Sequence, residues 1–70
     1  MSPRELEVLT LMCEGVTSTN DLCSQLHLAE RTIKAILSDI YAKLGVTDRA
    51  GAVAAAFREG IIDPADLSRA

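Results

Sequence analysis

The 70-residue sequence is poor in aromatic residues, in cysteine and in positive charge. It contains one tyrosine, one phenylalanine and no tryptophan, which excludes the platform of exposed rings on which single-stranded nucleic acids stack. Two cysteines are too few for the disulfide framework of a small secreted domain, so we expect a cytoplasmic protein. Ten acidic against seven basic residues give a net charge of −3, which argues against a polyanionic partner for the chain as a whole.

Signals for a membrane, an enzyme or a metal site are also missing. No apolar run approaches the roughly 20 residues that span a bilayer, so no membrane partner is expected. His27 is the only histidine and no nucleophile–base pair is evident, which argues against an enzyme, a metal ion or another cofactor. Cys13 and Cys23 lie on expected apolar helix faces, where we interpret them as small buried hydrophobic residues; a redox switch is the alternative.

The apolar residues recur with helical spacing throughout. They predict one all-α domain over residues 1–70, with helices at about 3–14, 19–26, 30–44 and 48–59 and a tail over 61–70 that includes a short fifth helical turn to about Leu67. Ser2 and Glu5 have the spacing of a capping box, and Ser18 is placed to cap the second helix.

The third and fourth helices differ in their patterns. One apolar stripe follows the third helix: Ile33, Ile36, Leu37, Ile40, Tyr41 and Leu44. The fourth helix is rich in alanine, and we expect its inner face to consist of Ala50, Val53, Ala54 and Phe57. That assignment leaves Ala52, Ala55 and Ala56 on a smooth outer surface.

A short helix, a turn at His27-Leu28-Ala29 and a longer amphipathic helix form a helix-turn-helix pattern. Around it, the stretches at 2–9, 26–34 and 43–46, followed by Arg49 and Ala52-Val53, resemble the LuxR/GerE-type DNA-binding domain that also ends the NarL/FixJ response regulators. The resemblance covers residues 1 to about 62. It implies a four-helix bacterial transcriptional regulator domain whose third helix enters the major groove of double-stranded DNA. In this family the domain most often follows a receiver or ligand-binding domain in a longer chain, but stand-alone members exist, and the sequence does not decide between the two.

The resemblance further implies specific contact residues. The expected DNA contacts come from the third helix and from the start of the second: Arg31, Thr32, Lys34, Ala35, Ser38, Lys43, Thr17, Ser18 and Thr19. Helix capping is the alternative role for the last three. A homodimer through the fourth helix is implied as well. Its expected interface is Ala52, Ala55 and Ala56, because small side chains let two helix backbones approach closely. The alternative is that these alanines are present only because alanine favours helix formation.

Several positions depart from the family pattern. Ala35 and Ile36 stand where the family commonly has a polar pair, and Ala35 can contact a thymine methyl group but cannot donate a hydrogen bond to a base. Asp39 stands where asparagine is common, and Ala42 replaces a frequent basic residue. Ala29 replaces a frequent serine N-cap, which costs about 1 kcal/mol of helix stability.

The charge of the helix-turn-helix segment, residues 17–46, is balanced. Three cations oppose three carboxylates: Arg31, Lys34 and Lys43 against Asp21, Glu30 and Asp39. We therefore expect weak DNA affinity of the monomer and a shallow dependence on salt, because each phosphate contact contributes about 0.9 to the log–log slope. The balance also leaves an alternative function, a helical protein-interaction or dimerisation module with weak or lost DNA binding.

Overall fold

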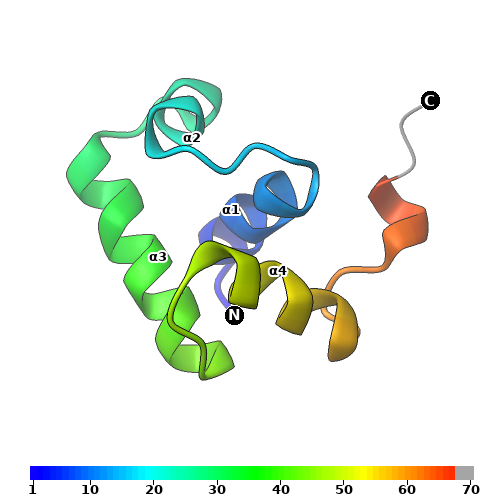
Figure 1. Cartoon of the computed structure of the whole chain (residues 1–70). Helices are drawn as coiled ribbons and strands as arrows, with labels where there is room; N and C mark the ends of the chain where they lie inside the picture. The colour runs from blue at the N-terminus through cyan, green and yellow to red at the C-terminus, as the bar shows by residue number, and fades with distance from the viewer. Residues whose placement is uncertain (68–70) are drawn as a thin grey trace.

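A computed structural model describes residues 1–67, which form four α-helices and one short 3₁₀ helix (Figure 1). Their order is α1 (Pro3–Cys13), α2 (Thr19–Leu26), α3 (Glu30–Leu44), α4 (Arg49–Arg58) and η1 (Pro64–Leu67). No strand occurs within this range, so the predicted all-α fold is confirmed. The expected tail extends to residue 70, and its last three residues lie outside the described part of the chain.

Side-chain caps begin three of the four α-helices. At α1, the Ser2 hydroxyl accepts a hydrogen bond from the Glu5 amide while the Glu5 carboxylate accepts one from the Ser2 amide, which is the predicted capping box. Ser18 caps α2, and Asp48 caps α4 by accepting from the Gly51 amide at 2.7 Å. Ala29 gives α3 no such hydrogen bond, so the longest helix begins without a side-chain cap.

The turn between α2 and α3 depends on a left-handed backbone conformation. His27 ends α2 with φ of 56°, a region that residues other than glycine seldom adopt. The Leu28 amide then donates to the Cys23 carbonyl at 3.2 Å, which closes the end of α2. The turn brings α3 back across α2, so the two helices form the helix-turn-helix expected from the sequence.

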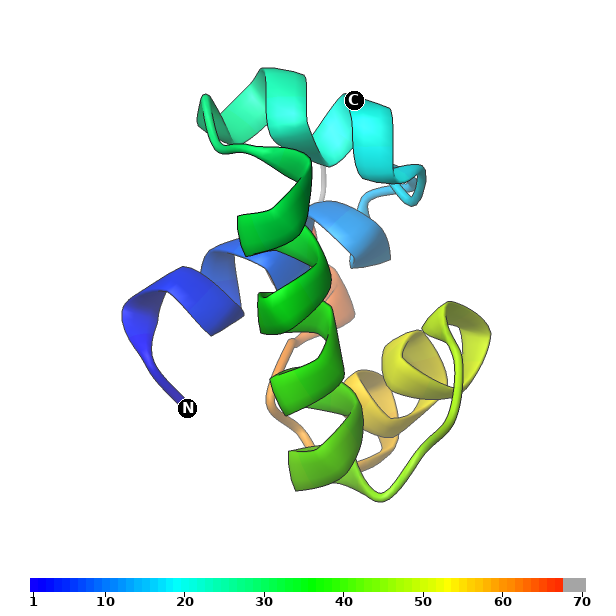
Figure 2. The same ribbon diagram turned by 90° about the vertical axis from the view of Figure 1, so that its left-hand side faces the viewer.

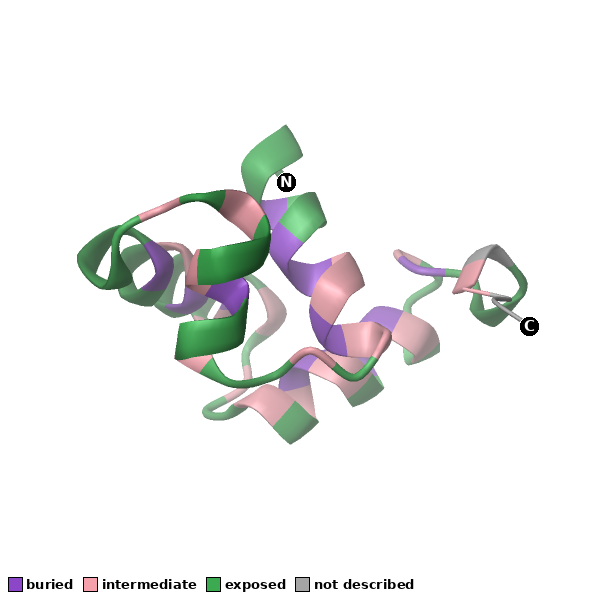
Figure 3. Ribbon diagram, turned by 90° about the horizontal axis from the view of Figure 1, so that it is seen from above, coloured by how far each residue is buried: buried purple, intermediate pink, exposed green. Residues whose placement is uncertain are grey.

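The core lies where α1, α3 and α4 pack together, with α2 covering α3 (Figure 3). Large side chains with no more than 2% exposure fill it: Val8, Leu9, Met12, Leu22, Ile33 and Ile40. The stripe predicted for α3 points inward, with Leu37 buried and Ile36, Tyr41 and Leu44 packed against the core. No helix between residues 1 and 67 combines the length and apolar character needed to cross a membrane.

The expected orientation of α4 is wrong for its alanines, although Val53 and Phe57 pack against the core as expected. Ala52, Ala55 and Ala56 have no exposed surface, whereas Ala54 is exposed and Phe57 is half-buried. The reason is that α4 packs against both α1 and α3, where methyl groups fit between closely spaced helices. The smooth alanine face predicted for the surface is therefore the inner face, and the larger side chains of α4 lie at its edges.

Candidate nucleic-acid interface

The outer face of α3 is open along most of the helix. Five residues expected to contact DNA are exposed on it: Arg31, Thr32, Lys34, Ala35 and Ser38. They lie opposite the inward stripe of Ile33, Leu37 and Ile40, so the core fixes which side chains point outward. Figure 2 shows α3 running down the front of the molecule, with α1 crossing behind it. The face is therefore free of other helices, and a helix of this diameter fits a major groove.

Two of the cations on this face differ in their partners. The Lys34 ammonium lies 2.9 Å from the Glu30 carboxylate, in a pair whose side chains are both more than half exposed. Such exposed pairs contribute only about 0–1 kcal/mol, so the ammonium can exchange a carboxylate for a phosphate at little cost. Arg31 has no ion-pair partner among residues 1–67 and is directly available to an anion.

Lys43 is held by a partner that the sequence analysis did not anticipate. Its ammonium donates to both carboxylate oxygens of Glu5, at 2.7 and 3.0 Å, and Glu5 is buried with 6% exposure. These hydrogen bonds, followed by those from Ser2, hold the pKa of the Glu5 carboxyl below its ordinary value. Because the two partners are 38 positions apart in the sequence, no local spacing indicates the contact. Lys43 therefore joins the end of α3 to the start of α1, and a phosphate would have to compete with Glu5 for its ammonium.

The hydroxyl groups at the start of α2 are only partly available. The Ser18 hydroxyl accepts from the Asp21 amide at 3.1 Å, so it acts as the helix cap. The Thr19 hydroxyl accepts from the Arg49 guanidinium at 2.7 Å, which connects the starts of α2 and α4. Thr17 is exposed and has no side-chain hydrogen bond within residues 1–67, so its hydroxyl is the open one of the three.

The departures from the family pattern fall on both sides of α3. Ile36 is half-buried and packs against the core, so it does not face outward. Asp39 and Ala42 are exposed, which places a carboxylate and a methyl group on or beside the open face. An exposed carboxylate repels phosphate, so Asp39 opposes the attraction that Arg31 and Lys34 supply.

The potential metal-ligating side chains and the two cysteines were expected from the sequence to have no role in metal or thiol chemistry. No group of three or more potential metal-ligating side chains occurs within the described chain. Cys13 and Cys23 are half-buried and pack against the core, in agreement with their interpretation as small hydrophobic residues. Burial, with a smaller contribution from Glu14, raises the pKa of the Cys13 thiol and lowers its reactivity at neutral pH.

Several known proteins and one protein family have sequences similar to this chain. Residues 1–56 match the family described as "Bacterial regulatory proteins, luxR family". The chain is 41% identical over 63 residues to the probable transcriptional regulatory protein NarL of Mycobacterium tuberculosis, covering 90% of this chain and 29% of that protein. It is 37% identical over 62 residues to the response regulator protein VraR of Staphylococcus aureus, covering 89% of this chain and 29% of VraR. A probable HTH-type transcriptional regulator, GfsR of Streptomyces halstedii, is 40% identical over 53 residues, covering 76% of this chain and 21% of GfsR. The chain thus spans less than a third of each of these relatives.

Proposed function

The chain belongs to the luxR family of bacterial regulatory proteins, and from that premise we propose that it binds double-stranded DNA sequence-specifically through α3. The family is described as bacterial regulatory proteins, and NarL and GfsR are described as probable transcriptional regulators, which indicates a regulator rather than an enzyme. The observation that carries the proposal is the open outer face of α3, on which Arg31, Lys34, Ala35 and Ser38 are all exposed. This face enters the major groove.

Each side chain on the face has a distinct chemical use. Arg31 and Lys34 supply positive charge for phosphates or for the O6 and N7 acceptors of guanine. The Ser38 hydroxyl can donate to or accept from a base edge, and the Ala35 methyl group fits against the methyl group of thymine. Lys43 is tied to Glu5 and contributes less to the affinity than its position on α3 suggests.

The test is a salt titration of binding to promoter DNA fragments, with the double variant Arg31→Ala/Lys34→Ala beside the wild type. Loss of two phosphate contacts should flatten the log–log salt slope by about 1.8 and weaken binding at low salt. Arg58→Ala is the matched control, because Arg58 is an exposed cation on α4. Identical binding of wild type and double variant at every salt concentration would refute the proposal. It would favour the alternative of an interaction module without DNA binding.

We further propose that the protein acts as a homodimer through the face of α4 that the structure leaves open. The residues of this face are Ala50, Val53, Ala54 and Phe57, which are exposed or half-buried. Ala52, Ala55 and Ala56 are unsuitable for that role, because they are enclosed in the core of the monomer. Ala54→Glu should abolish a dimer seen by analytical ultracentrifugation while leaving the circular dichroism spectrum unchanged. A dimer that survives the substitution would place the interface elsewhere.

The coverage of the relatives supports a wider proposal, in which this domain is the DNA-binding part of a longer regulator. VraR is described as a response regulator, and the match leaves most of its length unaccounted for. A receiver or ligand-binding domain on the same polypeptide would then control the exposure of α3. Sequencing the complete transcript and comparing DNA affinity of the 70-residue chain with that of the complete product tests this arrangement.

A further inference from the structure

The starts of α2 and α4 meet on one side of α3, as Figure 2 shows. The Arg49 guanidinium of α4 donates to the Thr19 hydroxyl of α2 at 2.7 Å, and both residues are half-buried. The Nε of Arg49 is enclosed without a hydrogen-bond partner, and no carboxylate pairs with the guanidinium within residues 1–67. The arginine side chain is thus packed against the protein and fixed by its hydrogen bond to Thr19.

The hydrogen bond from Arg49 determines what the Thr19 hydroxyl can offer to a ligand. A threonine hydroxyl has two acceptor lone pairs and one proton to donate, whereas a guanidinium can only donate. Because the oxygen accepts from Arg49, the hydroxyl proton points away from the guanidinium, and no group within residues 1–67 accepts it. The adjacent positive charge also polarises the O–H bond and strengthens it as a donor. Thr19 is therefore suited to a ligand atom that can only accept a hydrogen bond.

A phosphate oxygen of DNA is such an acceptor, and the place of Thr19 in the fold suits it. In a helix-turn-helix, the second helix lies in the major groove while the first crosses the phosphate backbone. Here α2 is the first helix and α3 the second, so the start of α2 lies beside the face that we propose for DNA. Hydroxyl groups are common donors to phosphates at such positions.

The charges around Thr19 do not form a basic patch. Asp21 lies in the first turn of α2, and Asp48, which precedes Arg49, accepts from the Gly51 amide. Neither carboxylate pairs with the Arg49 guanidinium within the described helices. One cation beside two carboxylates gives no net attraction for DNA. The hydroxyl can therefore contribute a directed hydrogen bond to a phosphate but does not release counterions.

We propose that Arg49 is a positioning residue for DNA binding, which orients the Thr19 hydroxyl as a donor to one phosphate of the strand beside α2. This inference rests on the proposed binding of DNA through α3 and adds a backbone contact to it. Arg49 acts on the phosphate through Thr19 and does not touch it. The contact fixes the register of α3 in the groove, because phosphate contacts position a protein on the duplex without reading its bases.

Methylphosphonate scanning tests this assignment, because it alters one phosphate of the DNA at a time and removes its charge. The duplex is selected from a random pool for binding to the 70-residue chain. Thr19→Val removes the hydroxyl at nearly constant volume, and Arg49→Met removes the guanidinium but keeps an apolar stem. We expect one methylphosphonate to weaken wild-type binding about fivefold and to change the binding of either variant less than about twofold. Each variant should bind the unmodified duplex about fivefold more weakly, with an unchanged salt slope.

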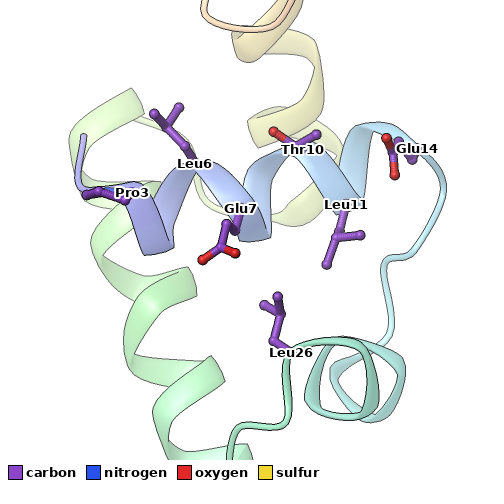
Figure 4. Close-up of a pocket in the computed structure, with 7 residues that line it drawn as sticks. All are labelled: Pro3, Leu6, Glu7, Thr10, Leu11, Glu14 and Leu26. Carbon is purple, nitrogen blue, oxygen red and sulfur yellow. The ribbon is translucent and has the colours of Figure 1, made fainter. Parts of the chain in front are cut away.

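Two matched controls lie elsewhere on the molecule. Thr10 lies on α1, in the lining of a hollow of about 510 Å³ on the outer side of that helix (Figure 4). Thr10→Val removes a hydroxyl there and should leave the affinity and the phosphate profile as in the wild type. Arg58→Met removes an exposed guanidinium at the other end of α4 and should leave the phosphate profile unchanged. Urea unfolding of every variant confirms that folded proteins are compared.

The possible outcomes separate the roles of the two residues. If Arg49 contacted the phosphate directly, Arg49→Met would flatten the salt slope by about 0.9 and Thr19→Val would remain sensitive to the methylphosphonate. If the hydrogen bond served only the packing of α2, both variants would keep their sensitivity at that phosphate or lose it along the whole strand. Either result overturns the proposal, as does wild-type affinity of either variant.

The proposed function has a separate readout in the same experiment. Loss of binding by Arg31→Ala/Lys34→Ala, with normal binding by the Thr19 and Arg49 variants, would overturn this inference alone. Failure to select any duplex, or normal binding by all of these variants, would overturn the proposed function as well.

Discussion

α3 and α4 both pack against α1, but the side chains that they bury are very different in size. α3 buries Ile33, Leu37 and Ile40, whereas α4 buries three alanines. Large apolar side chains fill the space between helices that lie well apart, and methyl groups fill it only where the backbones come close. The size of the buried side chains thus indicates how closely each helix approaches the core. Hydrophobicity alone would have predicted the wrong buried face for α4, because its larger apolar residues lie outside the alanine face.

The outer faces of the two helices differ as much as the inner ones. The open face of α3 is polar or small and carries cations, whereas that of α4 consists of Ala50, Val53, Ala54 and Phe57. Polar, cationic surfaces suit nucleic acid, and small apolar ones suit another helix. This difference supports the two proposals made above, DNA binding through α3 and self-association through α4. The following substitutions test the packing of the inner faces on which both proposals depend.

The largest effect is expected from a charge on the inner face of α4. Ala55→Glu buries a carboxylate without a partner, at a cost of about 3–5 kcal/mol or more. A domain of this size has a total stability of only about 4–10 kcal/mol, so the variant should be largely unfolded by circular dichroism. Ala54→Glu, one residue away and exposed, should stay within about 0.5 kcal/mol of the wild type in urea unfolding. Equal effects of the two substitutions would reject the orientation of α4.

The corresponding substitution on α3 removes volume rather than adding charge. Ile40→Ala leaves a cavity in the core and should lower the free energy of unfolding by about 2–5 kcal/mol. Ala42→Ser on the exposed side of the same helix is the control and should change it by less than about 0.5 kcal/mol. Denaturant unfolding measures both. A loss below 1 kcal/mol at Ile40 would show that α3 packs less tightly than its buried stripe indicates.

A third test uses the ion pair that joins α3 to α1. Because Lys43 and Ser2 lower the pKa of the folded Glu5, the carboxylate gives its full stabilisation above its ordinary pKa of 4.5. That stabilisation is lost as the pH falls below this value and through the lowered pKa. Thermal unfolding between pH 7 and pH 2 should therefore show a steeper acid decline for the wild type than for Glu5→Gln. Parallel profiles would show that the pair does not affect stability.

The smallest effects concern the starts of the two helices. Asp48→Ala removes the cap of α4 and should lower the free energy of unfolding by about 1 kcal/mol. Ala29→Ser supplies the cap that α3 lacks and should raise it by a similar amount, about 1 kcal/mol. Chemical denaturation of both variants measures the two changes in the free energy of unfolding. No gain at position 29 would mean that the start of α3 is held by its packing instead.

Local patterns were sufficient to predict much of this fold. The period of the α3 stripe gave the correct inner face, and the serine–glutamate spacing at Ser2 and Glu5 gave the correct start of α1. The face of α4 could not be found in this way, because alanine favours helix formation equally on buried and exposed sides. Lys43–Glu5 and Arg49–Thr19 connect residues 38 and 30 positions apart, and the approach of such residues depends on the tertiary packing of helices. The exposure of the outer face of α3, which we propose binds DNA, followed from periodicity, but the restraint on Lys43 did not.

The hydrogen bond between Arg49 and Thr19 has a mechanical consequence. It joins the first residue of α4 to the first residue of α2 at 2.7 Å, while the neighbouring Nε of Arg49 is enclosed with no partner. Separating the two helix starts would remove the side-chain hydrogen bond of a guanidinium whose Nε is already enclosed without a partner. The hydrogen bond therefore couples the start of α4 to the hydroxyl edge of α2 directly, in addition to the indirect connection of the two helices through α3.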